Sequence, residues 1–107
     1  MTSSTPSPTP VPEDSTFAAR LQGESLSDLT GLVEQAVRGL DGAGRSPLIA
    51  SFAADLAGPA RIGDRVIVSA AVDRVTRTLI FARADIRRES DQQLLLAAQL
   101  VLKVPIR

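Results

Sequence analysis

The C-terminal part of the chain decides the fold, since residues 65–104 read RVIVSAAVDRVTRTLIFARADIRRESDQQLLLAAQLVLKV. Three segments, 65–75, 78–88 and 93–104, are rich in Val, Ile, Leu and Ala, a composition typical of β-strands. Polar pairs and triplets between them predict tight turns. In the last two segments every second residue is apolar, so these residues share one face of the predicted sheet: Ile80, Ala82, Ala84 and Ile86, then Leu94, Leu96, Ala98, Leu100, Leu102 and Val104. The alternation predicts an antiparallel sheet with one apolar face.

A fourth strand precedes this stretch. Residues 48–56 follow Pro47 and are mostly apolar. Ala57-Gly58-Pro59 then breaks the strand, and Ile62-Gly63-Asp64 predicts a turn into the next one. We therefore expect the strands to follow one another as a meander, with one face that needs an apolar cover.

A single amphipathic helix is predicted over residues 25–41, and it is the only large cover available. Its apolar residues recur every three or four positions: Leu26, Leu29, Val33, Ala36, Val37 and Leu40. Ser25 is a suitable N-cap with Asp28 three residues later, as in a capping box. Gly42 and Gly44 follow Arg38 and predict the end of the helix. Two glycines inside it, Gly31 and Gly39, predict close packing.

The N-terminal part carries weaker signals. Residues 1–12 read MTSSTPSPTPVP, which offers little to bury and predicts a disordered leader. A Pro-rich docking peptide is the alternative interpretation. Phe17 and Leu21 are expected to anchor a brief strand or turn within 13–24. We expect one domain over residues 13–107.

Composition excludes several classes of function. The 107 residues contain no Cys and no His, which excludes catalytic triads, His-based hydratases and almost all zinc sites. Twelve basic residues balance twelve acidic ones, so no basic surplus indicates nucleic-acid binding. No apolar run is long enough for a membrane span, and no signal peptide opens the chain. We expect a cytoplasmic protein without cofactor or metal, and the eleven Arg residues against one Lys indicate a bacterial genome.

A resemblance adds to this reading. Residues 55–104, DLAGPARIGDRVIVSAAVDRVTRTLIFARADIRRESDQQLLLAAQLVLKV, resemble the hotdog-fold superfamily in its acyl-CoA thioesterase-like branch, of the PaaI and 4-hydroxybenzoyl-CoA thioesterase type. The marks are Pro59, Gly63-Asp64, the Arg74–Arg77 hairpin, the polar turn at Glu89–Asp91 and Ala97-Ala98. The resemblance implies an α+β fold in which an antiparallel sheet wraps around one central helix. It also implies a homodimer or tetramer with sheets paired edge to edge, and active sites between subunits.

The chain departs from this family at the site. Many members have a His-Gly pair before the helix, where this chain has Gln22-Gly23. The family's catalytic carboxylate follows that glycine by about two helical turns, which falls here on Gly31 or Leu32. The nearest acids are Asp28 and Glu34.

Thioester hydrolysis needs a base and a group that polarises the carbonyl. The resemblance implies Glu34 as base or nucleophile, with Gln22 and Gly23 near the thioester carbonyl. Asp28, Arg61 and Arg77 are the candidate substrate-binding residues, since Arg suits phosphate contacts. The alternatives are structural: a solvated Glu34, a first-turn Asp28 favoured by the helix dipole, a simple turn at Gln22-Gly23, and solubilising arginines. Ser51, Ser69 and Thr78 have no neighbouring base, which argues against a serine nucleophile.

Two functions follow from these residues. The first is an acyl-CoA thioesterase-like enzyme that uses the helix carboxylate. The alternative is a non-catalytic hotdog protein that binds acyl-CoA or a small ligand, or serves as a structural subunit. The absence of His and the shifted carboxylate favour the alternative. The absence of His also excludes the hydratase and dehydratase reactions of hotdog enzymes, which rely on that residue.

Overall fold

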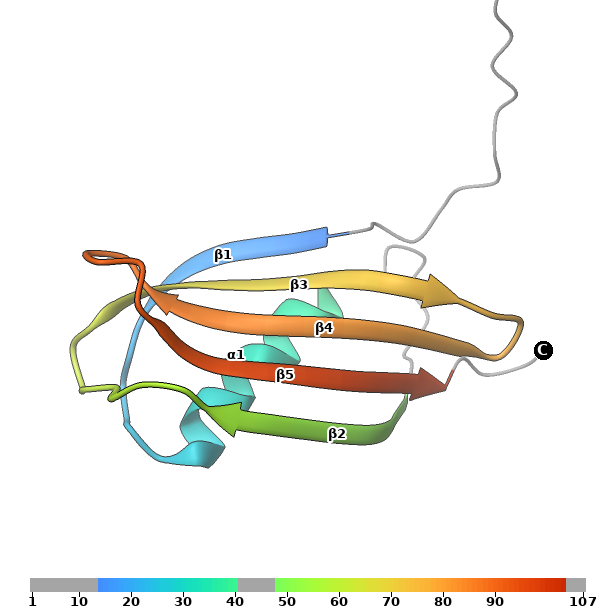
Figure 1. Ribbon diagram of the computed structural model, residues 1–107, viewed down its shortest axis with the longest axis horizontal. Coiled ribbons are helices and arrows are strands. Elements are labelled where there is room, and N and C mark those ends of the chain that lie inside the picture. The colour runs from blue at the N-terminus through green and yellow to red at the C-terminus, as the bar shows by residue number, and fades with distance from the viewer. Residues whose placement is uncertain (1–13, 41–47, 104–107) are drawn as a thin grey trace, which may run out of the picture.

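The protein is a five-stranded antiparallel sheet with one helix lying across one of its faces (Figure 1). The computed structural model describes residues 14–40 and 48–103. The elements are β1 (Asp14–Arg20), α1 (Leu26–Arg38), β2 (Leu48–Leu56), β3 (Arg65–Val75), β4 (Leu79–Arg88) and β5 (Leu94–Lys103). The α+β class predicted from the sequence is confirmed. The predicted leader, 1–12, lies outside the described residues, so the division into leader and domain stays a prediction.

The strand order differs from the expected meander. It runs β1-β3-β4-β5-β2, so only β3, β4 and β5 pair in succession. β2 pairs antiparallel with β5, which places Phe52 opposite Leu100 and Ala54 opposite Ala98. The local pattern of residues 48–56 identifies the strand but holds no information about its partner. β1 and β2 therefore form the two edges of the sheet.

Local capping sets the bounds of α1. Ser25 Oγ accepts a hydrogen bond from the Asp28 backbone N–H, and the Asp28 carboxylate accepts one from the Ser25 N–H at 3.1 Å. The predicted capping box is therefore confirmed. The helix ends at Arg38 with Gly39 as C-cap, three residues before the predicted end. Gly42 and Gly44 lie outside the described residues.

The core lies between the apolar stripe of α1 and the middle of the sheet. Leu29, Val33, Ala36 and Val37 are buried on the helix. They face inward-pointing side chains of the sheet, which are also buried: Val66, Val68, Ala70, Ile80, Ala82, Ala84, Ile86, Leu96, Ala98, Leu100 and Leu102. Burial of each Val, Leu or Ile side chain contributes about 1.5–3 kcal/mol. Aliphatic packing thus supplies a core that the sparse aromatics cannot.

One strand departs from the predicted alternation. The pairing of β4 with β5 shifts register between Ile86 and Arg87, so that Arg87 pairs with Leu94 and Ile86 pairs with Leu96. Leu95 is the extra residue and is fully buried, whereas Leu94 is only partly buried. The expectation that Leu94 belongs to the buried face is therefore wrong, because a bulge reverses the side on which residues point.

Coverage of the sheet by α1 is uneven. The helix packs mainly on β3 and β4 and also contacts β1, whereas it packs much less closely against β2. Nearly all of β2 is exposed, including the apolar side chains of Leu48, Ile49, Phe52 and Leu56. This uncovered strip beside the helix creates the groove described below.

Of the two helix glycines that were predicted to allow close packing, Gly39 does so and Gly31 does not. A Cβ at Gly39 would meet Ser15 Oγ at 2.3 Å, so that prediction is confirmed. A Cβ at Gly31 would meet nothing within 4 Å, so the predicted close packing there is wrong. A Cβ at Gly23, just before the helix, would meet Asp28 Oδ2 at 2.2 Å. Gly23 thus leaves room for the capping carboxylate.

These contacts predict opposite effects of the same substitution. Gly31→Ala should stabilise the protein by about 1 kcal/mol, because alanine favours the helix and its methyl group meets no obstacle. Gly23→Ala should destabilise it by about 1 kcal/mol or more, because the capping box has to open. Chemical denaturation of both variants and the wild type measures the free energies of unfolding. A destabilised Gly31→Ala variant would contradict the open space at this position.

Candidate functional site

A groove runs between α1 and β2 and is the strongest candidate site in the described part of the chain. Its volume is about 350 Å³. The helix contributes Ser27, Thr30, Gly31 and Glu34, and the sheet contributes Ile49, Phe52 and Leu100. One wall is therefore polar, with two hydroxyls and a carboxylate, and the other is apolar. Leu100 is only 2% exposed, whereas Phe52 is 39% exposed, so the ring is available to a ligand.

Glu34 is the only predicted catalytic residue that lines this groove. Its side chain is 50% exposed, and Oε2 lies 3.3 Å from Nη2 of Arg38, one helical turn further on. Such exposed ion pairs contribute little to stability. The carboxylate is therefore held loosely by a neighbour and remains open to water and to a ligand.

Gln22, Gly23 and Asp28 lie together at the start of α1, outside the set of groove-lining residues. The Asp28 carboxylate is occupied by the N-cap, and Gly23 packs directly against it. Gln22 is exposed. These contacts give Gly23 and Asp28 a structural role at the helix start. The roles expected from the sequence, Gln22 and Gly23 near the thioester carbonyl and Asp28 in substrate binding, stay predictions.

The structure does not bring Arg61 and Arg77 together. Arg61 lies in the connection between β2 and β3, and Arg77 lies in the turn between β3 and β4, at the opposite end of β3 (Figure 1). Eleven residues of extended strand separate these ends, a span of about 35 Å. One ligand of ordinary size therefore cannot contact both, and each remains only a separate candidate for phosphate binding.

Arg88 joins the loops at the end of the sheet that holds Arg61. Its Nε lies 3.3 Å from Asp64 Oδ2, its Nη1 lies 3.0 Å from Asp91 Oδ2, and its Nη2 donates to the Pro59 carbonyl. Only 18% of the Arg88 side chain is exposed. Asp64 also accepts from the Arg61 backbone N–H, as expected of a turn residue. Arg88 is thus committed to structure.

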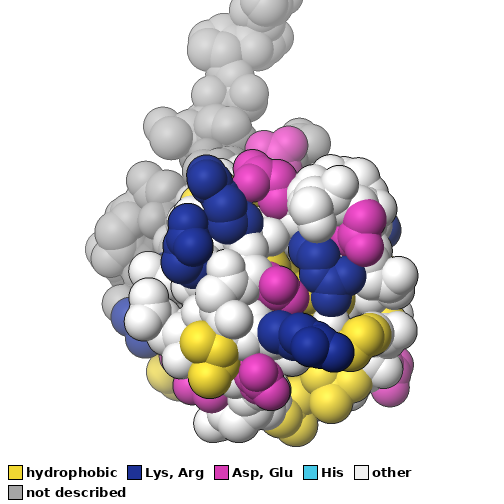
Figure 2. All heavy atoms as spheres, turned by 90° about the vertical axis from the view of Figure 1, so that its left-hand side faces the viewer, with side chains coloured by type: hydrophobic (Ala, Val, Ile, Leu, Met, Phe, Trp, Pro, Cys, Tyr) yellow, Lys and Arg dark blue, Asp and Glu magenta, His cyan; other side chains and the backbone are white. Residues whose placement is uncertain are grey.

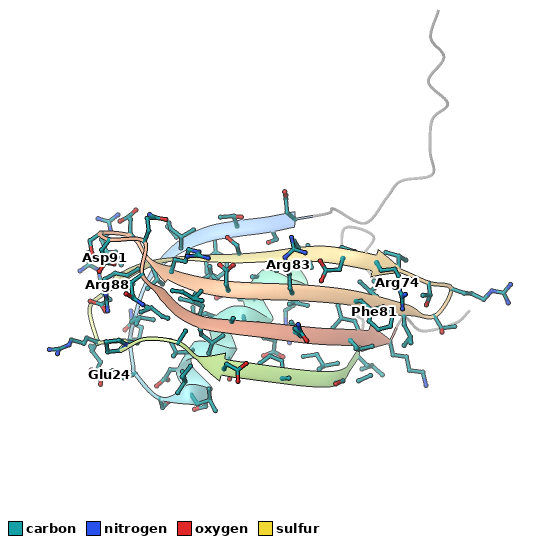
Figure 3. All side chains as sticks on the ribbon, in the orientation of Figure 1. Glu24, Arg74, Phe81, Arg83, Arg88 and Asp91 are labelled. Carbon is teal, nitrogen blue, oxygen red and sulfur yellow. The ribbon has the colours of Figure 1, made fainter. Side chains whose placement is uncertain are left out.

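Two pKa shifts follow from these contacts. The hydrogen bond with Asp64 raises the pKa of Arg88, and Asp91 adds to the effect. The backbone N–H of Gln93 lowers the pKa of the Asp91 carboxyl, and the Arg88 guanidinium lowers it further. Figure 3 shows Arg88 and Asp91 pointing toward one another at this end of the sheet.

The same end of the molecule carries charges of both signs. Figure 2 shows basic and acidic side chains intermixed over it rather than a single basic patch. Glu24 Oε2 accepts a hydrogen bond from the Ile62 N–H at 3.0 Å, which ties the loop before β3 to the start of α1. The position of this loop relative to the helix is therefore fixed by polar contacts.

The outer face of the sheet, opposite the helix, carries the charge pairs expected from the sequence. Arg83 pairs with Asp73, and Arg87 Nε lies 3.9 Å from Asp85 Oδ1. Arg74 stacks over the Phe81 ring, with its guanidinium carbon 4.5 Å from the ring centre (Figure 3). Lys103 has no ion pair with any described residue. These contacts account for most charges on this face without a ligand.

Most of the groove-lining residues are not recognisable as site residues from the sequence. Ser27, Thr30, Ile49, Phe52 and Leu100 were not singled out, although all but Leu100 are exposed or partly exposed. The available signal was weak: Phe52 is one of three aromatic residues and lies in a strand that alternates poorly. Only the pairing of β2 with β5 brings these residues beside the helix.

Two kinds of feature are not found among the described residues. Over 14–40 and 48–103, no three acidic side chains gather in a way that would hold a metal ion. The one described helix is too short and too polar to cross a membrane.

The fold and the groove define a class of protein, and comparison with known proteins names it. The sequence profile of the Thioesterase superfamily matches residues 10–95. The chain belongs to this superfamily, and its fold is the hotdog fold predicted from the sequence. No curated protein matches it by sequence.

Solved structures agree on the fold. Thioesterase superfamily member 2 from zebra fish is similar with a TM-score of 0.79 at 15% identity, covering 91% of this chain and 78% of that one. A hypothetical thioesterase from Streptococcus pneumoniae, solved with coenzyme A, has a TM-score of 0.77 at 12% identity, with coverages of 91% and 82%. The PaaI protein from the E. coli phenylacetic acid degradation operon has a TM-score of 0.77 at 13% identity, with coverages of 85% and 76%.

The hydrogen bond from the Gln93 N–H to Asp91, together with the contact of Asp91 with Arg88, predicts a pH-dependent effect of Asp91→Asn. Because the folded-state pKa of Asp91 is lowered, its carboxylate stabilises the protein above the unfolded-state pKa of about 3.9. That stabilisation is lost as the pH falls through the folded-state pKa. The variant should therefore have the lower Tm at neutral pH, and the difference should shrink below about pH 4. Thermal unfolding across this range measures it, and a difference independent of pH would contradict the assigned contact.

Proposed function

We propose that the protein hydrolyses an acyl-CoA thioester in the groove between α1 and β2. The observation that carries the proposal is the pairing of a wall of hydroxyls and a carboxylate with an apolar wall in one groove. An acyl thioester has the matching halves, an apolar chain and a polarised carbonyl. Membership of the thioesterase superfamily supports this class of substrate, as does the coenzyme A in the Streptococcus pneumoniae structure.

The acyl group is proposed to lie against Ile49, Phe52 and Leu100, where burial of apolar surface favours binding. The carbonyl then lies beside the helix at the level of Thr30 and Gly31. Thr30 precedes Glu34 by one helical turn, so their side chains are neighbours on the same face. This arrangement puts a hydroxyl and a carboxylate on either side of the reacting carbonyl.

Glu34 is proposed to act as general base in the reaction. It accepts a proton from a water molecule while the water oxygen bonds to the carbonyl carbon. The tetrahedral intermediate then collapses, the carbon–sulfur bond breaks, and the CoA sulfur leaves with the proton held by Glu34. The products are a carboxylic acid and CoA, and no other reactant is needed.

Gln22 and Gly23 take a different place in this proposal. Leu26 and Glu34 are separated by eight residues, about 12 Å along the helix axis. A carbonyl within reach of Glu34 therefore lies too far from Gln22-Gly23 for contact. We assign these residues, with Asp28, to the path of the CoA portion beyond the thioester.

A homodimer is proposed to complete the site. β2 pairs with β5 on one side, no described strand pairs with its other side, and it carries exposed apolar side chains. Such an edge favours pairing with another strand. A second copy related by a two-fold axis would pair its own β2 there and cover the open side of the groove. Tetramer formation and a cytoplasmic location stay predictions.

The second candidate function is binding of an acyl-CoA or a similar ligand without hydrolysis. The ion pair between Glu34 and Arg38, together with the exposure of both side chains, favours it. The Glu34 side chain is half exposed and its carboxylate is paired with Arg38, so no described contact orients it toward a substrate. In this alternative the same groove holds the ligand, and Glu34 only contributes to its polar wall.

The prediction for activity concerns Glu34→Gln. If Glu34 is the base, kcat/KM on the best acyl-CoA should fall by about 100-fold or more, because general-base catalysis is lost while the side-chain shape is kept. Release of free CoA thiol across a panel of short, long, branched and aromatic acyl-CoAs measures it. Glu89→Gln is the matched control, since Glu89 pairs with Arg65 and neither residue lines the groove, and it should keep wild-type activity. Wild-type binding without turnover would establish the non-catalytic alternative.

The prediction for assembly concerns the free edge. Wild-type protein should have a solution mass of about twice 11.3 kDa. Ala53→Lys, in the middle of β2, should shift it to the monomer, since lysines on an edge strand oppose pairing. Thr16→Lys on β1, the other edge, is the control and should leave the dimer intact. Sedimentation velocity distinguishes the forms, and a Thr16→Lys monomer with a dimeric Ala53→Lys variant would reverse the assignment of the edge.

A further inference from the structure

Gly31 is a glycine that the chain itself does not explain. It lies in the interior of α1, where glycine is less favourable than alanine. The other glycines next to the helix have close neighbours that exclude a side chain, Ser15 for Gly39 and Asp28 for Gly23. Apart from its chain neighbours and the backbone of its own helix, Gly31 has no described atom within 4 Å of its missing Cβ, and its φ lies in the ordinary range. The reason for the glycine therefore lies outside this chain's own packing.

The position of Gly31 shows which space it keeps open. It lines the groove on the helix wall, which it shares with Ser27, Thr30 and Glu34. Phe52 and Ile49 line the facing wall, and both are exposed. Leu100 is nearly completely buried. A missing side chain on one wall widens a groove and leaves its length unchanged.

We infer that Gly31 determines which acyl groups this groove accepts, by admitting groups that are broad close to the carbonyl. The inference rests on the proposed function, since it uses the same groove and the same class of ligand. An acyl group with branches on its first carbon fills the space between the helix backbone and the ring of Phe52. A straight acyl chain with the same number of carbon atoms fits a narrower groove, so narrowing the groove leaves its affinity nearly unchanged.

A pair of isomeric ligands distinguishes the effect of the breadth of the acyl group from the effect of its apolar surface area. The thioethers S-(2,2-dimethylpropyl)-CoA and S-pentyl-CoA carry the same atoms in branched and straight form, and neither can be hydrolysed. Titration calorimetry gives Kd for both. Wild-type protein is expected to bind the branched ligand at least as tightly as the straight one. Gly31→Leu is expected to weaken the branched ligand by about tenfold or more, and the straight ligand by no more than about threefold.

Two control variants, Gly31→Ala and Gln35→Leu, test whether the effect of Gly31→Leu is indirect. Leucine favours helices and its Cβ enters open space, so Gly31→Leu is expected to fold. Gly31→Ala adds a single methyl group and should give an intermediate shift in the ratio of the two Kd values. Gln35→Leu makes the same kind of change on an exposed position of α1 outside the groove lining, and should leave the ratio unchanged.

The outcomes are distinct. An equal loss for both ligands in Gly31→Leu overturns the inference and leaves the proposed function standing. Unchanged Kd values with a weakened dimer also overturn it, because the glycine would then serve contact between two copies. If wild-type protein binds neither ligand, nor acetyl-CoA, the proposed function fails and the inference fails with it. A selective loss of the branched ligand, absent in Gln35→Leu, supports both.

Discussion

Packing of the α1 stripe against the middle of the sheet is the contact on which the rest of the structure depends. Val33 and Ala36 are fully buried at its centre, against strands whose inward residues are almost all aliphatic. With one helix and one sheet, neither layer buries its apolar face without the other. The helix is narrower than the sheet, and it lies over β3 and β4. The strip that it leaves uncovered becomes the groove, so the site is a direct consequence of how two unequal layers fit.

Local sequence patterns predicted the helix and the strands, but they did not predict which strands pair over long distances in the chain. Ser25 and Asp28 identified the start of α1, and the alternation around Ile80–Ile86 identified the buried face of β4, because both signals depend only on near neighbours. The place of β2 beside β5 depends on a contact between residues about 45 apart, which no local period encodes. The bulge at Leu95 was missed for a related reason: one extra residue reverses the alternation without changing its composition.

The candidate site divides in the same way. Glu34 could be found from the sequence as an acid off the apolar stripe of a helix. Phe52 and Ile49 could not, because they become groove residues only through the strand order. Arg88 was grouped with the other arginines, and its contacts with Asp64 and Asp91 depend on the meeting of two loops. Polar residues on one helix are therefore predictable, whereas a wall shared between helix and strand is not.

The strand order also sets when the groove can form during synthesis. β2 leaves the ribosome early, yet its only partner in the sheet is β5, the last strand of the described chain. Until residue 103 has emerged, β2 and its exposed phenylalanine have no strand to pair with, while β3 and β4 can already form a local hairpin. A nascent chain thus acquires the sheet wall of the proposed site only once β5 is available to pair with β2. Truncation within the final strand removes that wall even where the β3–β4 hairpin persists.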